Sequence, residues 1–154
     1  MYVSFDSLVD SSRLWVYGSD TVLTNTQQEY ITKQLISFLE NWEYHQKKLT
    51  ASFKIFENRF LIVALDDSEH GVGGCSMDGL QRLVQSFERE LSISLMNRLN
   101  VFCKMDGDIQ CIPSFKLGAI ANSSTLFYDL TILKKGEIES FLKPISEGWC
   151  SHLV

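Results

Sequence analysis

The chain has 154 residues, the length of one ordinary domain, and 45% of them are hydrophobic against 21% charged. A chain of this size buries a core without needing disulfides or metals. Fourteen Lys and Arg against nineteen Asp and Glu give a net charge of -5, which disfavours nucleic-acid binding by phosphate neutralisation. We expect one folded domain over residues 1–154 with no nucleic-acid partner.

The first residues, MYVSFDSLVDSSR, lack the basic and apolar regions of a secretion signal. The longest apolar run, 60–65, is too short to cross a membrane. These features predict a cytoplasmic protein without a membrane partner. The four cysteines show neither CxxC spacing nor a histidine at zinc-finger spacing, so we expect free thiols, no metal and no cofactor.

The first part of the chain predicts a strand followed by a helix. Residues 13–17, RLWVY, are aromatic and branched, which is typical of a strand. Thr24 and Gln27 have the spacing of a capping box, and apolar residues follow at helical intervals as far as Trp42.

The middle of the chain predicts a hairpin and a second helix. Residues 51–55 alternate between apolar and polar, whereas 60–65 are apolar throughout. A tight turn joins the two strands, with Asn58 expected to take a positive φ. Apolar residues at helical spacing between 80 and 95 predict a helix that begins near Gly79.

The next part of the chain predicts a second hairpin, and the order of all the elements then predicts the fold. Residues 101–105 and 109–112 read as a hairpin turning at Asp106 and Gly107. The order β-α-β-β-α-β indicates an α+β, ferredoxin-like antiparallel sheet with two helices on one face. The C-terminal extension, 113–154, is expected to hold a strand within 126–133 and a short helix over 136–142.

The stretch GVGGCSMD, residues 71–78, joins the apolar strand to the second helix and is the first candidate site. A helix N-terminus stabilises a thiolate, so Cys75 is a candidate nucleophile with His45 or His70 as its base. The alternative is a packed turn in which Ser76 caps the helix. The sheet topology would bring Trp42 and Asp78 to the same rim.

The same stretch is a candidate anion or small-ligand site through its backbone. The N–H groups of Gly74, Cys75, Ser76 and Met77 would then hold the ligand. No lysine follows the glycines, and neither the P-loop spacing nor the dinucleotide-binding spacing is present. Nucleotide hydrolysis is therefore not expected here.

An acidic group precedes the glycines. Asp66, Asp67, Glu69 and His70 carry the oxygen and nitrogen ligands that a divalent ion could use. A solvated acidic loop after a buried strand is the more common explanation, so we predict no metal site. Cys103 and Cys111 lie symmetrically about Gly107, where a hairpin could bring them face to face or leave them as two reduced thiols on adjacent strands.

The stretches MYVSFDSL, ASFKIFENRF and GGCSMD resemble a family of short bacterial proteins that carry the label "ABC transporter ATPase". The resemblance covers most of the chain but implies no catalytic residue. The chain has no Walker A loop, no Walker B run and no LSGGQ-like signature. ABC-type ATPase activity is therefore not expected.

The sequence favours a cytoplasmic binding or assembly module over an enzyme. A sheet edge or a pocket near residues 42–48 and 70–78 would contact an unknown protein partner or a small ligand. Assembly into a homo-oligomer is a further alternative. The alternatives are a small thiol-dependent enzyme using Cys75 and a ligand site at residues 73–78.

Overall fold

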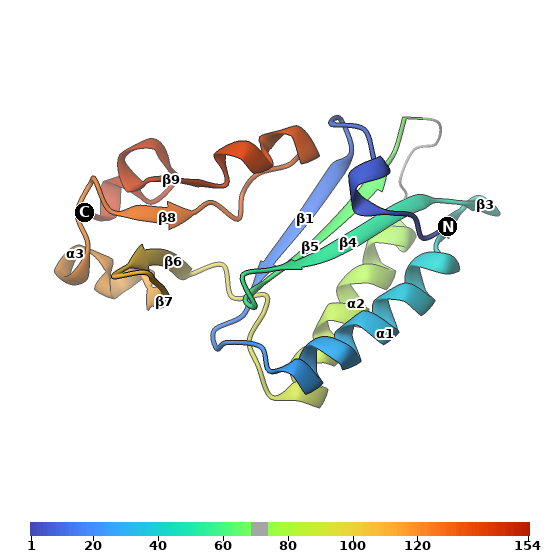
Figure 1. The fold of residues 1–154 in the computed structure, drawn as a ribbon, viewed down its shortest axis with the longest axis horizontal. Coiled ribbons are helices and arrows are strands. Elements are labelled where there is room, and N and C mark those ends of the chain that lie inside the picture. Colours follow the sequence, from blue (N-terminus) through green and yellow to red (C-terminus); the bar gives the residue numbers. More distant parts are fainter. Residues whose placement is uncertain (69–73) are drawn as a thin grey trace.

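The computed structural model describes residues 1–68 and 74–154, which form helices and antiparallel sheets in the α+β class (Figure 1). In chain order the strands and helices are β1 (Arg13–Gly18), α1 (Asn25–Glu40), β2 (Glu43–Tyr44), β3 (Lys47–Lys48), β4 (Thr50–Phe56), β5 (Phe60–Asp66), α2 (Gly74–Leu91), β6 (Asn100–Met105), β7 (Asp108–Pro113), α3 (Leu117–Ile120), β8 (Leu126–Tyr128) and β9 (Leu142–Pro144).

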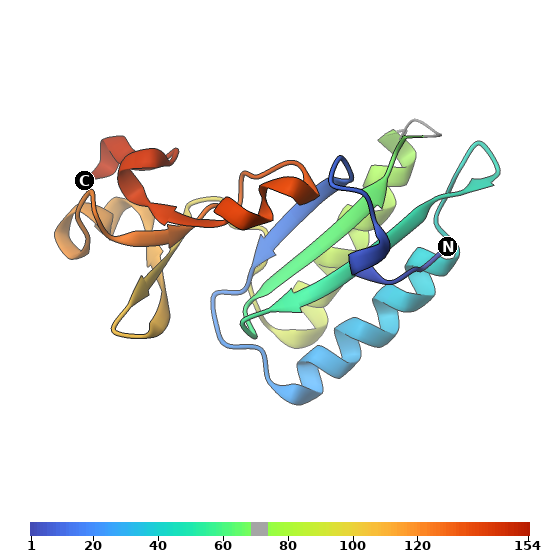
Figure 2. The same cartoon turned by 45° about the horizontal axis from the view of Figure 1, so that its top comes forward.

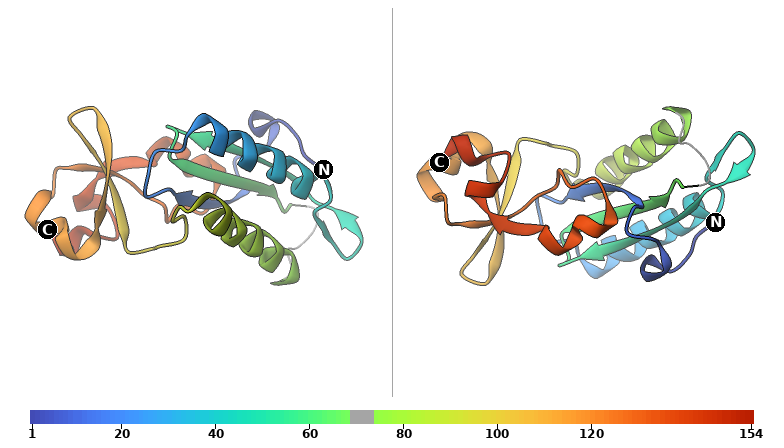
Figure 3. Two further views of the ribbon diagram at one scale, coloured as in Figure 1. Left: turned by 90° about the horizontal axis from the view of Figure 1, so that it is seen from below. Right: turned by 90° about the horizontal axis from the view of Figure 1, so that it is seen from above.

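The first sheet has the strand order β1-β5-β4, with both pairs antiparallel. Helices α1 and α2 cover one face of it (Figure 3). The predicted capping box starts α1: Gln27 N–H donates to Thr24 Oγ1 at 3.1 Å, and Thr24 N–H donates to Gln27 Oε1 at 2.9 Å. Apolar residues such as Leu35 and Val84 pack this helical face against the sheet, and their burial provides the main stabilisation.

Both predicted hairpin turns are confirmed. Glu57 and Asn58 have φ values of 55° and 56° between β4 and β5. Asp106 and Gly107, with φ of 54° and 82°, form the two-residue turn between β6 and β7. Two successive positive φ values match the right-handed twist of the strands that the turn joins.

A short hairpin of β2 and β3 projects from the first sheet at the end opposite the second sheet (Figure 2). Its turn residues, His45 and Gln46, have φ of 51° and 65°. The hairpin therefore carries His45 at an exposed tip.

The ferredoxin-like order is not confirmed. Three of its strands are present in the expected order, but β6 lies in a second sheet, β7-β6-β8-β9, instead of beside β1. At the edge of β1 the segment around Lys134 pairs instead: Leu14 N–H donates to Leu133 O at 2.9 Å and Lys135 N–H donates to Ser12 O at 2.9 Å. The C-terminal residues thus occupy part of the position of the missing strand.

The second face of the first sheet is covered by segments of the C-terminal half of the chain together with the N-terminal residues Val3, Phe5 and Leu8 (Figure 3). Phe60 packs against Phe102, Tyr128 and Phe141, with ring centroids 4.8–5.3 Å apart. This second core joins the two sheets and explains why β5 is apolar on both faces. The predicted helix over 136–142 is a 3₁₀ helix at Lys135–Ser140.

No helix in the described ranges combines the length and apolar character that crossing a bilayer requires.

Candidate functional site

The rim predicted near Trp42 is a packed contact. The Trp42 indole Nε1–H donates to Ser76 O at 2.9 Å, and the Ser76 hydroxyl donates to Glu43 O at 2.8 Å. The first turn of α2 is thereby fixed to the segment that follows α1. Ser76 is not the helix cap, because α2 begins at Gly74 rather than near Gly79 and Ser76 therefore has helical backbone within the first turn.

The thiol hypothesis is not tested by the described residues. His45 is exposed at the hairpin tip, where its ring lies 4.0 Å from the Tyr44 ring. His70 and the side chain of Cys75 lie outside the described part of the chain. The ligand site predicted for the backbone of residues 74–77 falls in the first turn of α2, where N–H groups lack partners within the helix.

The predicted acidic loop is described as far as Ser68. The Asp66 carboxylate accepts bonds from Ser68 N–H at 3.0 Å and Ser68 Oγ at 2.6 Å, and these hydrogen bonds lower the pKa of Asp66. Glu69 and His70 lie outside the described residues. In the ranges 1–68 and 74–154 no group of three metal-ligating side chains is present.

Cys103 and Cys111 do not face each other. The register of β6 and β7 pairs Cys103 with Gln110 and Phe102 with Cys111. Because neighbouring residues of a strand point to opposite faces, the two thiols lie on opposite faces of the second sheet. Both are free thiols, as the second of the two sequence readings predicts.

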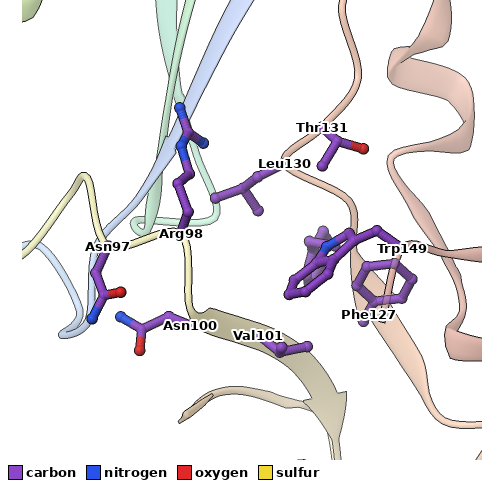
Figure 4. Close-up of a pocket in the computed structure, with 9 residues that line it drawn as sticks. Asn97, Arg98, Asn100, Val101, Phe127, Leu130, Thr131 and Trp149 are labelled. Carbon is purple, nitrogen blue, oxygen red and sulfur yellow. The ribbon is translucent and has the colours of Figure 1, made fainter. Parts of the chain in front are cut away.

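A site that the sequence did not predict lies beside β1. Three adjoining hollows, which we call the β1 groove, share the side chain of Arg98. The first, of ≈ 330 Å³, is lined by Asn97, Arg98, Asn100, Val101, Phe127, Tyr128, Leu130, Thr131 and Trp149 (Figure 4). The second, of ≈ 270 Å³, is lined by residues 13–16, Arg98 and residues 130–133. The third, of ≈ 350 Å³, is lined by Trp15, Tyr17, Met77, Leu80, Gln81, Met96 and Arg98.

Cations and aromatic rings alternate along the groove. The Arg13 guanidinium lies 5.0 Å from the centre of the Trp15 ring, and that of Arg98 lies 5.6 Å from the Tyr17 ring. Arg13, Trp15 and Tyr17 are alternate residues of β1 and so share one face. Burial raises the pKa of Tyr17, and the positive charge of Arg98 opposes that rise. The groove is thus locally basic on a protein of net negative charge.

The groove exists because the strand pairing beside β1 stops early. Leu14 pairs with Leu133. At Thr131, two residues before Leu133, the chain turns away from β1. The turn is fixed by Asp129, whose Oδ1 accepts a bond from Thr131 N–H at 2.9 Å. The Thr131 N–H therefore cannot continue the ladder with β1, and the two segments separate.

Sequence reasoning missed this site for an identifiable reason. Arg98 stands alone in a connection between α2 and β6, where no motif marks it. The available signal was the alternation of Arg13, Trp15 and Tyr17, which places a cation and two rings on one face of a strand.

Comparison with protein-family models, curated proteins and solved structures finds no match to this chain.

Proposed function

We propose that the chain is a binding module that holds a small ligand in the β1 groove. The observation that carries this proposal is the convergence of three hollows on the single side chain Arg98. Ligand sites are typically concave and mainly apolar, with a few polar groups that orient the ligand. The first hollow, walled by Phe127, Leu130 and Trp149, has this character.

The groove supports binding without a catalytic assignment. Its polar side chains are two arginines, two asparagines, a glutamine, a threonine and two tyrosines. A general base near neutral pH usually requires a histidine or a carboxylate with an adjusted pKa, and neither side chain is among the lining residues. This composition favours recognition over acid–base chemistry.

The proposal also covers the cellular compartment, the family and the fold of the protein. We infer a cytoplasmic protein related to the family of short bacterial proteins that the sequence resembles, on the basis of the quoted stretches and the free thiols. A ferredoxin-like origin of residues 13–91 is supported by the order β1-β5-β4 and by two helices on one face. A basic groove of this size suits a small molecule better than nucleic acid.

Screening a diverse fragment library against ¹⁵N-labelled protein tests the function. We expect some fragments to shift the amide signals of Val101, Leu130 and the Trp149 indole in a saturable way. Trp149→Ala should weaken these fragments, because it removes a wall of the first hollow. Phe115→Ala is the matched control, since Phe115 is 83% exposed and lines none of the three hollows. If no fragment shifts the groove amides, the proposed function is wrong.

A further inference from the structure

We propose that the β1 groove recognises a carboxylate attached to a planar apolar group, such as an aryl carboxylate. This inference rests on the proposed function and adds the chemical class of the ligand. It combines an unpaired strand edge, an unneutralised guanidinium and an adjoining apolar hollow.

The first element is the backbone of β1. Antiparallel pairing directs the N–H and C=O of alternate residues to opposite sides of a strand. Leu14 N–H donates away from β5, to Leu133 O, so Val16 directs its backbone groups to the same side. Arg98 Nη1 donates to Val16 O at 3.0 Å. No acceptor for the Val16 N–H occurs in the described part of the chain, and Val16 lines the second hollow.

The second element is the charge of Arg98. Within residues 1–68 and 74–154 the only ion pair joins Lys143 to Asp129, so no described carboxylate neutralises Arg98 or Arg13. A guanidinium has five N–H donors in a planar fork that matches the two oxygens of a carboxylate. One donor of Arg98 is used by Val16 O. The Arg98 guanidinium and the Val16 N–H therefore lie at the same edge of β1.

The third element is the space for the rest of the ligand. Figure 4 shows Arg98 directed toward β1, with Leu130 beside it and the rings of Trp149 and Phe127 across the hollow. The volume of ≈ 330 Å³ is near the lower end of the range for ligand pockets. It suits a body of one or two rings, which would stack on the aromatic walls.

The Asp129 carboxylate near the groove is already neutralised. Asp129 directly precedes Leu130, which lines both the first and second hollows. Although burial alone would raise the pKa of Asp129, hydrogen bonds from Lys143 and Thr131 lower it, so its carboxylate is ionised at neutral pH. Lys143 neutralises this carboxylate at 2.9 Å, so Asp129 does not compete with a ligand for Arg98.

Three probes separate the contributions of charge and ring: 2-naphthoate, its neutral amide 2-naphthamide, and acetate. We expect 2-naphthoate to shift the Val16 amide and the Trp149 indole signals. Its affinity should exceed that of the amide by about tenfold or more, since a hydrogen bond to a charged group is worth that factor. It should also exceed that of acetate, because acetate has the charge but no ring for the apolar hollow to bury. Arg98→Gln should remove this advantage while leaving 2-naphthamide binding nearly unchanged. Arg82→Gln, which replaces an exposed residue of α2, should alter the binding of neither 2-naphthoate nor 2-naphthamide.

The outcomes distinguish the inference from the proposed function. If 2-naphthoate and 2-naphthamide bind the groove equally, or if Arg98→Gln weakens both alike, the carboxylate inference is wrong and the binding function stands. If 2-naphthoate binds without moving the Val16 amide, the strand-edge contact is wrong. If none of the probes binds and the fragment library also leaves the groove amides unshifted, both proposals fail.

Discussion

Arg98 and Val16 are joined by a hydrogen bond of 3.0 Å from the guanidinium Nη1 to the backbone oxygen. In a ferredoxin-like sheet the last strand would pair with β1 at this edge. Here the Arg98 side chain bonds to Val16 O, and the segment around Lys134 bonds to Ser12 O and the Leu14 N–H, which, among the described residues, leaves the Val16 N–H available. An edge covered in this way is protected from strand addition by another chain, while space remains beside it for a ligand.

The first prediction concerns the stability contributed by Arg98. We expect Arg98→Ala to lower the free energy of unfolding by about 1 kcal/mol, because it removes one backbone hydrogen bond and the contact with the Tyr17 ring. Urea denaturation measures this change. Arg82→Ala should lie within about 0.5 kcal/mol of the parent. A loss above about 3 kcal/mol for Arg98→Ala would mean that Arg98 is a structural support rather than an available ligand contact.

The second prediction concerns Asp129, which is buried and paired with Lys143 at 2.9 Å. Hydrogen bonds from Lys143 and Thr131 outweigh the effect of burial and lower its pKa below the ordinary value of 3.8. The pair therefore stabilises the fold above about pH 4, and this contribution is lost as pH falls through the folded-state pKa. We expect Asp129→Asn to cost about 1–3 kcal/mol at pH 7, because it leaves Lys143 half-buried without its partner.

Urea denaturation of the parent and of Asp129→Asn at pH 7 and pH 3 checks this prediction. The difference between the two proteins should shrink at pH 3, where the parent carboxylate gains its proton. Asp78→Asn is the control, since Asp78 is exposed on α2 and should change stability by less than about 0.5 kcal/mol. An unchanged difference at the two pH values would contradict the assigned role of the charge.

The local structure was largely predictable from the sequence. The capping box of Thr24 and Gln27 and the turn at Asp106 and Gly107 depend on a few adjacent residues, and both are confirmed. The partner of β6 was not predictable, because alternation reports which faces of a strand are buried but not which strand lies beside it. β1 is buried because C-terminal residues such as Tyr128 cover its second face, and that part of the sequence has the weakest periodicity.

The candidate site, like the fold, could be predicted from the sequence only in part. The order of the elements placed Trp42 and the start of α2 at one rim, and the hydrogen bond from Trp42 to Ser76 O joins them there. The β1 groove did not follow, because it depends on where the pairing of Leu133 with Leu14 stops. That end point is set by the turn at Asp129, more than a hundred residues from β1 in the chain.

The third prediction concerns the reactivity of Cys103. Burial, with a smaller contribution from Cys150, raises the pKa of Cys103 to about 11, so almost none of the reactive thiolate is present at pH 7. We expect iodoacetamide to leave Cys103 unmodified in the folded protein and to modify it in urea, as peptide mass spectrometry would show. The half-exposed Cys111 should react faster. Modification of Cys103 within minutes without denaturant would contradict the described packing.

The fourth prediction concerns the anchor of α2. Trp42→Phe keeps an aromatic ring but removes the donor to Ser76 O, so this carbonyl, which lies within α2, keeps its helical bond but loses the indole donor. We expect a loss of about 1–3 kcal/mol in the free energy of unfolding. Trp149→Phe should cost less, since Trp149 is 38% exposed and has no hydrogen bond from its indole to the described residues. Equal losses in the two variants would indicate that ring size, rather than the hydrogen bond, is what matters.

The last prediction concerns the close packing of the two sheets at Gly18. A Cβ added to Gly18 would lie 2.5 Å from the Phe102 ring. Phe102 is almost fully buried and packs against Phe60 with ring centroids 5.3 Å apart, so its ring cannot move without displacing the second core. We expect Gly18→Ala to cost about 1–3 kcal/mol, as overpacking of a core does.

Two further variants test whether this cost comes from the Phe102 ring. Adding Phe102→Leu to Gly18→Ala should cost less than the sum of the two single changes, because the smaller side chain relieves the overlap. Gly74→Ala is the control: it is the first residue of α2, with no heavy atom within 4 Å of the added Cβ, and its replacement should change stability by less than about 0.5 kcal/mol. Simple additivity in the double variant would place the cost in the β1 backbone, and the join between the sheets would then be less tightly packed than the Gly18 contact implies.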